Sequence, residues 1–153
     1  MARLEDFTEP MRSHLEQLDC GSFPGAPWVA AKPLNERRIA IVSTAGLQRR
    51  GDRPFDLGTA DFRVIPGETP ARDIIMSHIS TNFDRSGFQA DVNVALPADR
   101  LRELADEGVI GSVADYHYSF MGATDPILMQ PHAERMIALM RDDGVDTALL
   151  VPI

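Results

Sequence analysis

Cysteine is almost absent from this chain of 153 residues, since Cys20 is its only thiol. A single thiol excludes a disulfide within the chain and a zinc site built from several thiolates. It also excludes, within one chain, a racemase that acts through a pair of thiols. We interpret Cys20, in the turn-like stretch LDCGSFPG, as an incidental thiol, and the cytoplasm is the expected location.

Positive charge and long apolar runs are also scarce. Lysine and arginine number 15 against 23 acidic residues, which gives a formal net charge of -8. That balance argues against a general nucleic-acid binder and discourages binding to anionic membranes. No apolar run approaches the roughly 18 residues of a membrane span. The first residues lack the basic region and apolar core of a signal peptide.

Short apolar runs alternate with amphipathic stretches after residue 36, which is typical of an α/β domain with a mainly parallel sheet. We predict strands within 37–46, 61–70, 71–80 and 144–153, the first and last of them buried. Helices are expected near 97–108 and 125–143, with Pro131 in the first turn of the second. The stretch 115–126 is expected to be a polar and aromatic loop.

The first 36 residues differ in composition from the rest. Apolar spacing predicts an amphipathic helix near residues 3–18, interrupted at Pro10, and a Pro- and Gly-rich arm follows it. Trp28 is the expected anchor of this arm on the domain or on a second subunit. The sequence therefore predicts a terminal helix and arm over residues 1–36, and a single three-layer domain over residues 37–153.

Polar residues follow the first predicted strand, where ligands of parallel sheets usually bind. Ser43, Thr44 and Gly46 are placed to offer backbone N–H groups to an anion. Three arginines come next in the chain: Arg49, Arg50 and Arg53. A carboxylate or phosphate is the natural guest of such a cluster.

The three arginines have an alternative interpretation as surface partners of nearby acids. Those acids are Asp52, Asp56 and Asp61. The surrounding spacing matches neither G-x-G-x-x-G nor a P-loop, so the cluster does not indicate a nucleotide site.

A second polar cluster follows the predicted strand within 71–80. Ser77 and His78 lie at its exit, and Asn82 comes shortly after. Histidine titrates near neutrality and serves as acid, base or ligand, although a single histidine at a strand end is often structural. We take His78 as a candidate for proton transfer, and Ser77 and Asn82 as candidates for substrate contact.

The third cluster is DYHYSFMG, which contains His117, Tyr118 and Ser119. In a strand, His117 would point to one face and both neighbouring tyrosines to the other. We take His117 as a candidate for proton transfer or substrate orientation, and Tyr118 and Ser119 as substrate contacts. A structural role for the cluster is equally compatible with the sequence.

Known catalytic motifs are missing around these clusters. Neither H-x-H nor H-E-x-x-H occurs, so no metal site is predicted. The G-x-S-x-G elbow of serine hydrolases is also missing. The residues alone therefore name no reaction, and a hydrolase or racemase is the least supported class.

Four segments resemble the selenoprotein B family, the substrate-specific subunits of glycine, sarcosine, betaine and D-proline reductases. They are ERRIAIVSTAGLQRRGDRPFDLG, FRVIPGETP, PADRLRELADEGVIGSVADYHYSFMG and DDGVDTALLVPI. The segments follow the family's order and run from about Arg37 to Ile153. The pair GVIGS and HYSFMG is fairly specific.

This resemblance implies reductive cleavage of a C–N bond next to a carboxylate. A selenolate or thiolate attacks the α carbon, and reducing equivalents come from a thiol- or selenol-containing electron-transfer protein. A small amino acid or betaine-like carboxylate is the implied substrate. The three arginines and the loop after the first strand would suit its carboxylate group.

In the family, the strand matching ALLVPI continues into the redox motif, so selenocysteine or cysteine is expected just after Ile153 if the reading frame continues. The chain itself carries no cofactor and no matching nucleophile. Three explanations stay open: a UGA codon read as a stop, a deliberate shortening, or a natural short relative. In each case this chain alone is expected to be inactive.

A second functional class also fits the sequence: a non-catalytic module that binds a small carboxylate or another subunit. We further expect a homo-oligomer, because the Trp28 arm and the apolar final strand would each bury surface against a second copy.

Overall fold

The computed structural model describes residues 3–17, 22, 25, 29–80 and 85–153. Trp28 and Asn82, to which the sequence assigned roles, lie outside the described residues, and so does Cys20, the incidental thiol.

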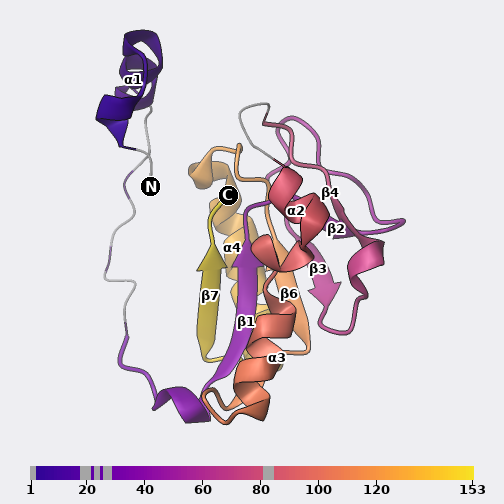
Figure 1. Ribbon diagram of the computed structural model, residues 1–153. Coiled ribbons are helices and arrows are strands. Elements are labelled where there is room, and N and C mark those ends of the chain that lie inside the picture. The colour runs from indigo at the N-terminus through magenta and orange to yellow at the C-terminus, as the bar shows by residue number, and fades with distance from the viewer. Residues whose placement is uncertain (1–2, 18–21, 23–24, 26–28, 81–84) are drawn as a thin grey trace.

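Strand β1 (Arg38–Ser43) lies at the centre of the main sheet (Figure 1). Strand β7 (Thr147–Val151) pairs with it in parallel along one edge. The short β5 (Ser112–Val113) and then β6 (Tyr116–Ser119) pair in parallel along the other edge. Beyond β6, β3 (Arg63–Pro66) is antiparallel. The predicted mixed α/β fold with a mostly parallel sheet is confirmed.

Strand β6 corrects the loop expected at 115–126. The stretch looked like a loop because polar and apolar residues are mixed in it. In the structure the imidazole Nδ1 of His117 accepts a hydrogen bond from the Ile41 amide (3.3 Å), and the hydroxyl of Ser119 accepts one from the Leu47 amide (2.8 Å). Backbone donors therefore satisfy polar side chains inside the sheet, where their polarity would otherwise be costly.

The predicted strand within 71–80 is also placed differently. The strand that forms there, β4 (Ile74–Met76), lies outside the main sheet. It pairs antiparallel with β2 (Leu47–Arg49) in a separate two-stranded sheet. Strand β2 falls in the polar segment after β1, where no strand was predicted. The amide of Ser77, directly after β4, donates to the carbonyl of Gly46 (2.9 Å). This hydrogen bond holds the end of β4 against the loop that follows β1.

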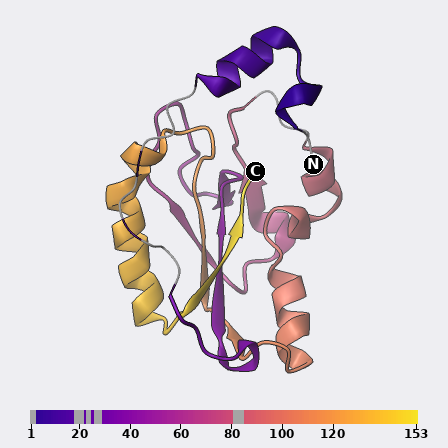
Figure 2. The same ribbon diagram turned by 90° about the vertical axis from the view of Figure 1, so that its left-hand side faces the viewer.

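Helices α3 (Ala98–Asp106) and α4 (Pro126–Asp142) cover opposite faces of the main sheet (Figure 2). One buried cluster joins α3 to the sheet and includes Ile39, Ile41, Ile65, Leu96 and Leu101. The other joins α4 to the sheet and includes Ala40, Val42, Tyr118, Met136 and Met140. Alternate residues of β1 thus enter different cores, as strand geometry requires.

The shorter helical segments are η1 (Leu4–Asp6), η2 (Leu34–Glu36), η3 (Ala71–Asp73), α2 (Ser86–Ala90) and η4 (Val92–Val94). Within the described part of the chain, no helix has the length and apolar character needed to cross a bilayer.

Helix α4 begins earlier than its proline suggested. Asp125 caps the helix by accepting a hydrogen bond from the Ile127 amide (2.9 Å), and Pro126 occupies the first turn. Pro131 therefore lies inside the helix, which corrects its predicted place in the first turn.

Helix α1 (Glu9–Glu16) contains no buried residue and lies apart from the sheet in both views (Figures 1 and 2). The described residues that lead from it into β1 are exposed, and Val29 is 84% accessible. Lys32 lies just before η2 in the chain, and its ammonium group contacts the Asp146 carboxylate beside the start of β7 (3.0 Å).

The final strand β7 is less buried than its apolar sequence predicted. Among the described strands it pairs with β1 alone and so forms an edge of the sheet, and Leu150 is 65% exposed. An exposed apolar edge is a surface to which a further strand can add. The homo-oligomer stays a prediction.

The end of α4 is tied to the start of the sheet by Asp143. Its carboxylate pairs with the Arg38 guanidinium and accepts hydrogen bonds from the amides of Asp115 (2.9 Å) and Tyr116 (3.3 Å). The side chain of Asp143 is only 6% exposed, so little water competes for these contacts. One carboxylate thus joins β1, the β5–β6 connection and α4.

We predict that Asp143→Ala lowers the free energy of unfolding by about 3 kcal/mol, because it removes one carboxylate partner of a half-buried guanidinium and leaves two backbone donors without their acceptor. The matched control is Asp142→Ala at the neighbouring exposed position, expected to change that energy by no more than about 0.5 kcal/mol. Urea unfolding at pH 7 measures both. Equal effects of the two substitutions would contradict the role assigned to Asp143.

Candidate functional site

The carboxyl ends of β1 and β7 are held together by Thr44 and Ile153. The Ile153 amide donates to the Thr44 hydroxyl (2.8 Å), and that hydroxyl donates to the Ile153 carbonyl (3.1 Å). Gly122, after β6, closes the same corner, because a Cβ there would lie 2.6 Å from the Ile153 oxygen and 2.9 Å from the Thr44 oxygen. The segments that follow β1, β6 and β7 are therefore in direct backbone contact at this edge.

Gly46 brings the second polar cluster to the same edge. Its φ of +65° lies in the left-handed region that favours glycine. A Cβ at this position would also approach the His78 amide nitrogen to 3.1 Å. The Gly46 amide donates to the Phe120 carbonyl (2.9 Å), which adds the segment after β6. His78, Thr44 and Gly122 consequently belong to one region, which we call the carboxyl edge.

The loop after β1 does not offer the free N–H groups that its sequence suggested. The amide of Thr44 donates to Val151 O (3.1 Å), and that of Ala45 to the Ser43 hydroxyl (3.2 Å). The amides of Gly46 and Leu47 are engaged as already described. The loop is thus a hydrogen-bonded corner of the protein, and these N–H groups form no anion cradle.

The two serines proposed as substrate contacts hold loops in place. The Ser77 hydroxyl donates to Gln48 Oε1 (2.9 Å) and accepts from the Phe55 amide (3.1 Å). The fully buried Ser119 hydroxyl accepts from Leu47. Both hydroxyl groups therefore stabilise the loops around them through hydrogen bonds within the protein.

His78 is 6% exposed, and its Nδ1 accepts a hydrogen bond from the Ser80 amide (3.2 Å). Burial, followed by the nearby charge of Arg85, lowers the pKa of His78. The Arg85 guanidinium donates to the backbone carbonyls of His78 and Ser80. Arg85 therefore supplies positive charge at the carboxyl edge. No role was predicted for Arg85 from the sequence.

His117 lies inside the sheet and is fully buried. Because its Nδ1 accepts from Ile41, the neutral ring carries its proton on Nε2, which has no hydrogen-bond partner among the described residues. Burial first, and then the charge of Arg102, lowers its pKa to about 4, while Asp143 opposes the shift. His117 is thus a neutral interior histidine at pH 7 and does not reach the sheet edge.

The three arginines of the first cluster pair with acids on the surface. Arg49 contacts Asp52 (Nε–Oδ2, 3.2 Å), and Arg53 contacts Asp56 (Nη2–Oδ2, 3.4 Å). These two contacts match the alternative that the sequence left open. The remaining arginine and acid have other partners, Arg50 contacting Asp73 and Asp61 contacting Arg63.

Arg49 and Arg50 line an open depression of about 840 Å³ together with the loop that follows β3. The same depression contains three carboxylates, from Asp52, Glu68 and Asp73. Two guanidinium groups against three carboxylates leave a net negative charge, which disfavours an anionic ligand.

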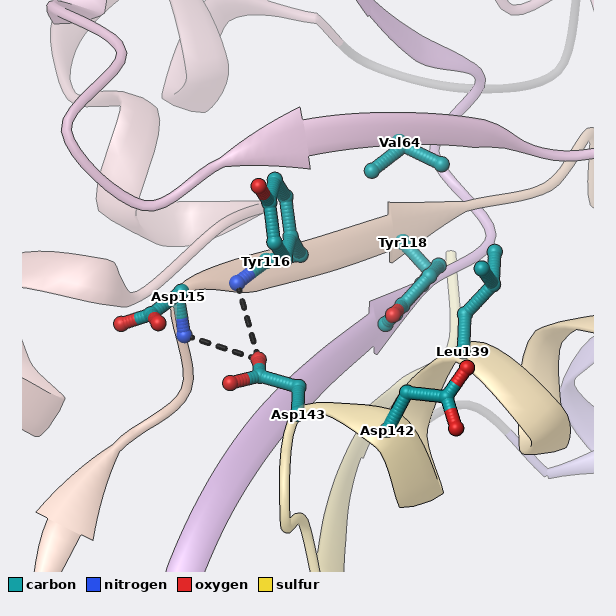
Figure 3. Close-up of a pocket in the computed structure, with 7 residues that line it drawn as sticks. All are labelled: Val64, Asp115, Tyr116, Tyr118, Leu139, Asp142 and Asp143. Carbon is teal, nitrogen blue, oxygen red and sulfur yellow. Dashed lines mark hydrogen bonds between the residues drawn. The ribbon is translucent and has the colours of Figure 1, made fainter.

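Tyr118 points to the face covered by α4, opposite to His117. It lines a cavity with Tyr116, Val64 and residues at the end of α4 (Figure 3). The tyrosines and the histidine of DYHYSFMG therefore serve different faces, and only its last residues approach the carboxyl edge.

Comparison with known proteins identifies the class. The family model described as glycine/sarcosine/betaine reductase selenoprotein B matches residues 26–152, so the chain belongs to this family.

Individual relatives agree with that assignment. The chain is 31% identical to D-proline reductase subunit gamma of Acetoanaerobium sticklandii over 83% of its own length and 53% of that protein. It is 29% identical to the betaine reductase complex component B subunit beta of Peptoclostridium acidaminophilum, over 78% of the chain and 28% of the relative. Identity is 28% to the glycine reductase complex component B subunit gamma of Carboxydothermus hydrogenoformans, over 81% and 30%.

The chain therefore spans about half of the D-proline reductase subunit and under a third of the two others. No solved structure matches it.

We predict that His117 makes the protein less stable as the pH falls from about 6.5 to about 4. In this window the unfolded imidazole binds a proton and the folded one does not, so unfolding takes up a proton. The loss at the lower limit is about 3 kcal/mol, and the full contribution is present above pH 6.5. Urea unfolding across pH 4–7 measures it.

Replacement of His117 by leucine should flatten this pH dependence, whereas His14→Leu on exposed α1 should leave it unchanged. His78 contributes with the same sign, so some slope persists in the His117 variant. An unchanged slope in His117→Leu would contradict the assignment.

Proposed function

We propose that this chain forms the substrate-binding part of a selenol- or thiol-dependent reductase that cleaves a C–N bond beside a carboxylate. Membership of the selenoprotein B family supports the reaction class. The observation that carries the proposal is the corner where Ile153, Thr44 and Gly122 meet, because it holds the end of β7 beside the two other polar loops. In the family, the nucleophile follows the strand that β7 represents.

The reaction at this edge would proceed by displacement. The selenolate or thiolate forms a bond to the α carbon of the substrate, and the C–N bonding pair leaves with the nitrogen, which takes up a proton. A thiol of an electron-transfer protein then attacks the selenium or sulfur, and the bonding pair of the broken carbon–selenium or carbon–sulfur bond goes to the α carbon, which takes up a proton. A second thiol of that protein displaces the nucleophile, so the pair of thiols is oxidised to a disulfide. The names of the relatives, as subunits of reductases and reductase complexes, are consistent with such a partner.

Arg85 is the residue we propose for carboxylate binding. One guanidinium nitrogen is engaged by the carbonyls of His78 and Ser80, and among the described residues the other N–H groups of the fork have no hydrogen-bond partner. We propose that a carboxylate binds there. The arginine cluster at 49–53 is less suitable, because its own acids neutralise it. His78, neutral at pH 7, would orient the substrate next to Arg85.

We predict that Arg85→Gln weakens binding of D-proline by about tenfold, because a charge-assisted hydrogen bond is lost. Titration calorimetry measures the affinity, and pyrrolidine, which has the ring without the carboxylate, is the ligand control. Arg50→Gln is the matched protein control and should leave the affinity unchanged. An equal loss in both variants would place the carboxylate elsewhere.

We predict that residues 1–153 alone do not cleave glycine, sarcosine, betaine or D-proline with a dithiol as reductant, since Cys20 is their only thiol. Amine formation from any of these substrates would contradict this expectation. The companion test extends the chain with a cysteine-containing redox motif after Ile153. Carboxylate binding without cleavage by the extended chain would favour a non-catalytic binding module.

A further inference from the structure

A second cavity, of about 410 Å³, lies between the β3–β6 pair and the end of α4. Its walls include Val64, Tyr116 and Tyr118 from the strands, and Leu139 and Asp142 from the helix (Figure 3). It occupies the α4 face near the start of β6, whereas the carboxyl edge lies beyond the end of β6. The proposed reductase chemistry makes no use of it.

The hydroxyl of Tyr118 indicates that this cavity can bind a polar ligand. Tyr118 is 1% exposed, and its hydroxyl makes no hydrogen bond to another described residue. The side chain is therefore buried apart from access through the cavity, and a ligand there gains a hydrogen bond with this hydroxyl. Burial, followed by the charge of Asp143, raises the pKa of Tyr118 to about 12, so the hydroxyl keeps its proton at neutral pH.

The cavity wall carries excess negative charge. Asp115, Asp142 and Asp143 line it, and the Arg38 guanidinium contacts the first (3.1 Å) and the last of them. Within the described ranges the Asp142 carboxylate forms no ion pair. The C-terminal end of the 17-residue helix α4 adds its negative dipole end. These charges favour a cation and repel a carboxylate.

The remaining walls are apolar. Val64 and Leu139 offer aliphatic surface, and the ring of Tyr116, which is 44% exposed, offers a face suited to alkyl groups or to a cation. From this combination we infer that the cavity binds a small protonated alkylamine. Its ammonium group would donate to the Asp142 carboxylate and the Tyr118 hydroxyl oxygen, while its alkyl chain lies between Val64 and Leu139.

This inference is independent of the proposed reductase function, because it requires neither a nucleophile nor a carboxylate site. The test is an NMR titration of the full chain with n-butylammonium, following the amides of Tyr116 and Leu139. Saturable shifts are expected, with affinity about tenfold higher than for 1-butanol, which has the same alkyl chain without charge. Butyrate should produce no saturable shift.

Two substitutions separate the contacts. Asp142→Asn should weaken n-butylammonium binding about fivefold, and Tyr118→Phe about threefold. Asp106→Asn, at the end of α3, is the matched control with the same loss of charge and should leave the affinity unchanged. Circular dichroism checks folding, and Asp142→Asn alone decides the matter if the buried tyrosine variant does not fold.

Three outcomes would overturn the inference. The first is equal binding of 1-butanol and n-butylammonium. The second is a loss in Asp142→Asn no greater than in Asp106→Asn. The third is tighter binding of tetramethylammonium, which has no N–H group to donate to Asp142 or Tyr118.

Discussion

The hydrogen bonding of β1 on both of its edges is the constraint on which the rest of the structure depends. β5 and β6 pair with one edge and β7 with the other, so one six-residue strand sets the register of every parallel neighbour. The alternation of its side chains divides the interior into two cores, one under α3 and one under α4. Its carboxyl end then fixes the corner formed by Thr44, Ile153 and Gly122.

Elements with strong apolar periodicity could be predicted from the sequence. The run of β-branched residues predicts β1, and the helical spacing of apolar residues around Leu101 predicts α3. Both elements formed where expected. Strand β6 was missed because its buried polar groups depend on amides of Ile41 and Leu47, which are distant in sequence. The antiparallel pairing of β4 with β2 likewise depends on a partner that no local pattern identifies.

The candidate site shows the same division. That polar loops gather at the carboxyl ends of β1 and β7 follows from parallel topology, and the structure brings Thr44, Gly46 and His78 together there. Which groups remain available for a ligand could not be predicted. The arginines near β2 are neutralised by neighbouring acids. The Arg85 guanidinium contacts the backbone carbonyl of His78, and this contact depends on how the chain folds between the two residues.

The pairing of β1 with β7 also has a consequence for the order of folding. The Arg38 amide bonds to the Asp146 carboxylate, a separation of 108 residues, and the β1–β7 ladder follows from that contact. During synthesis β1 emerges long before β7, so one edge of the central strand stays open until β7 has left the ribosome. Loop closure over such a distance slows folding. Until β7 is made, a nascent chain of this protein therefore exposes an apolar strand edge, to which a chaperone could bind.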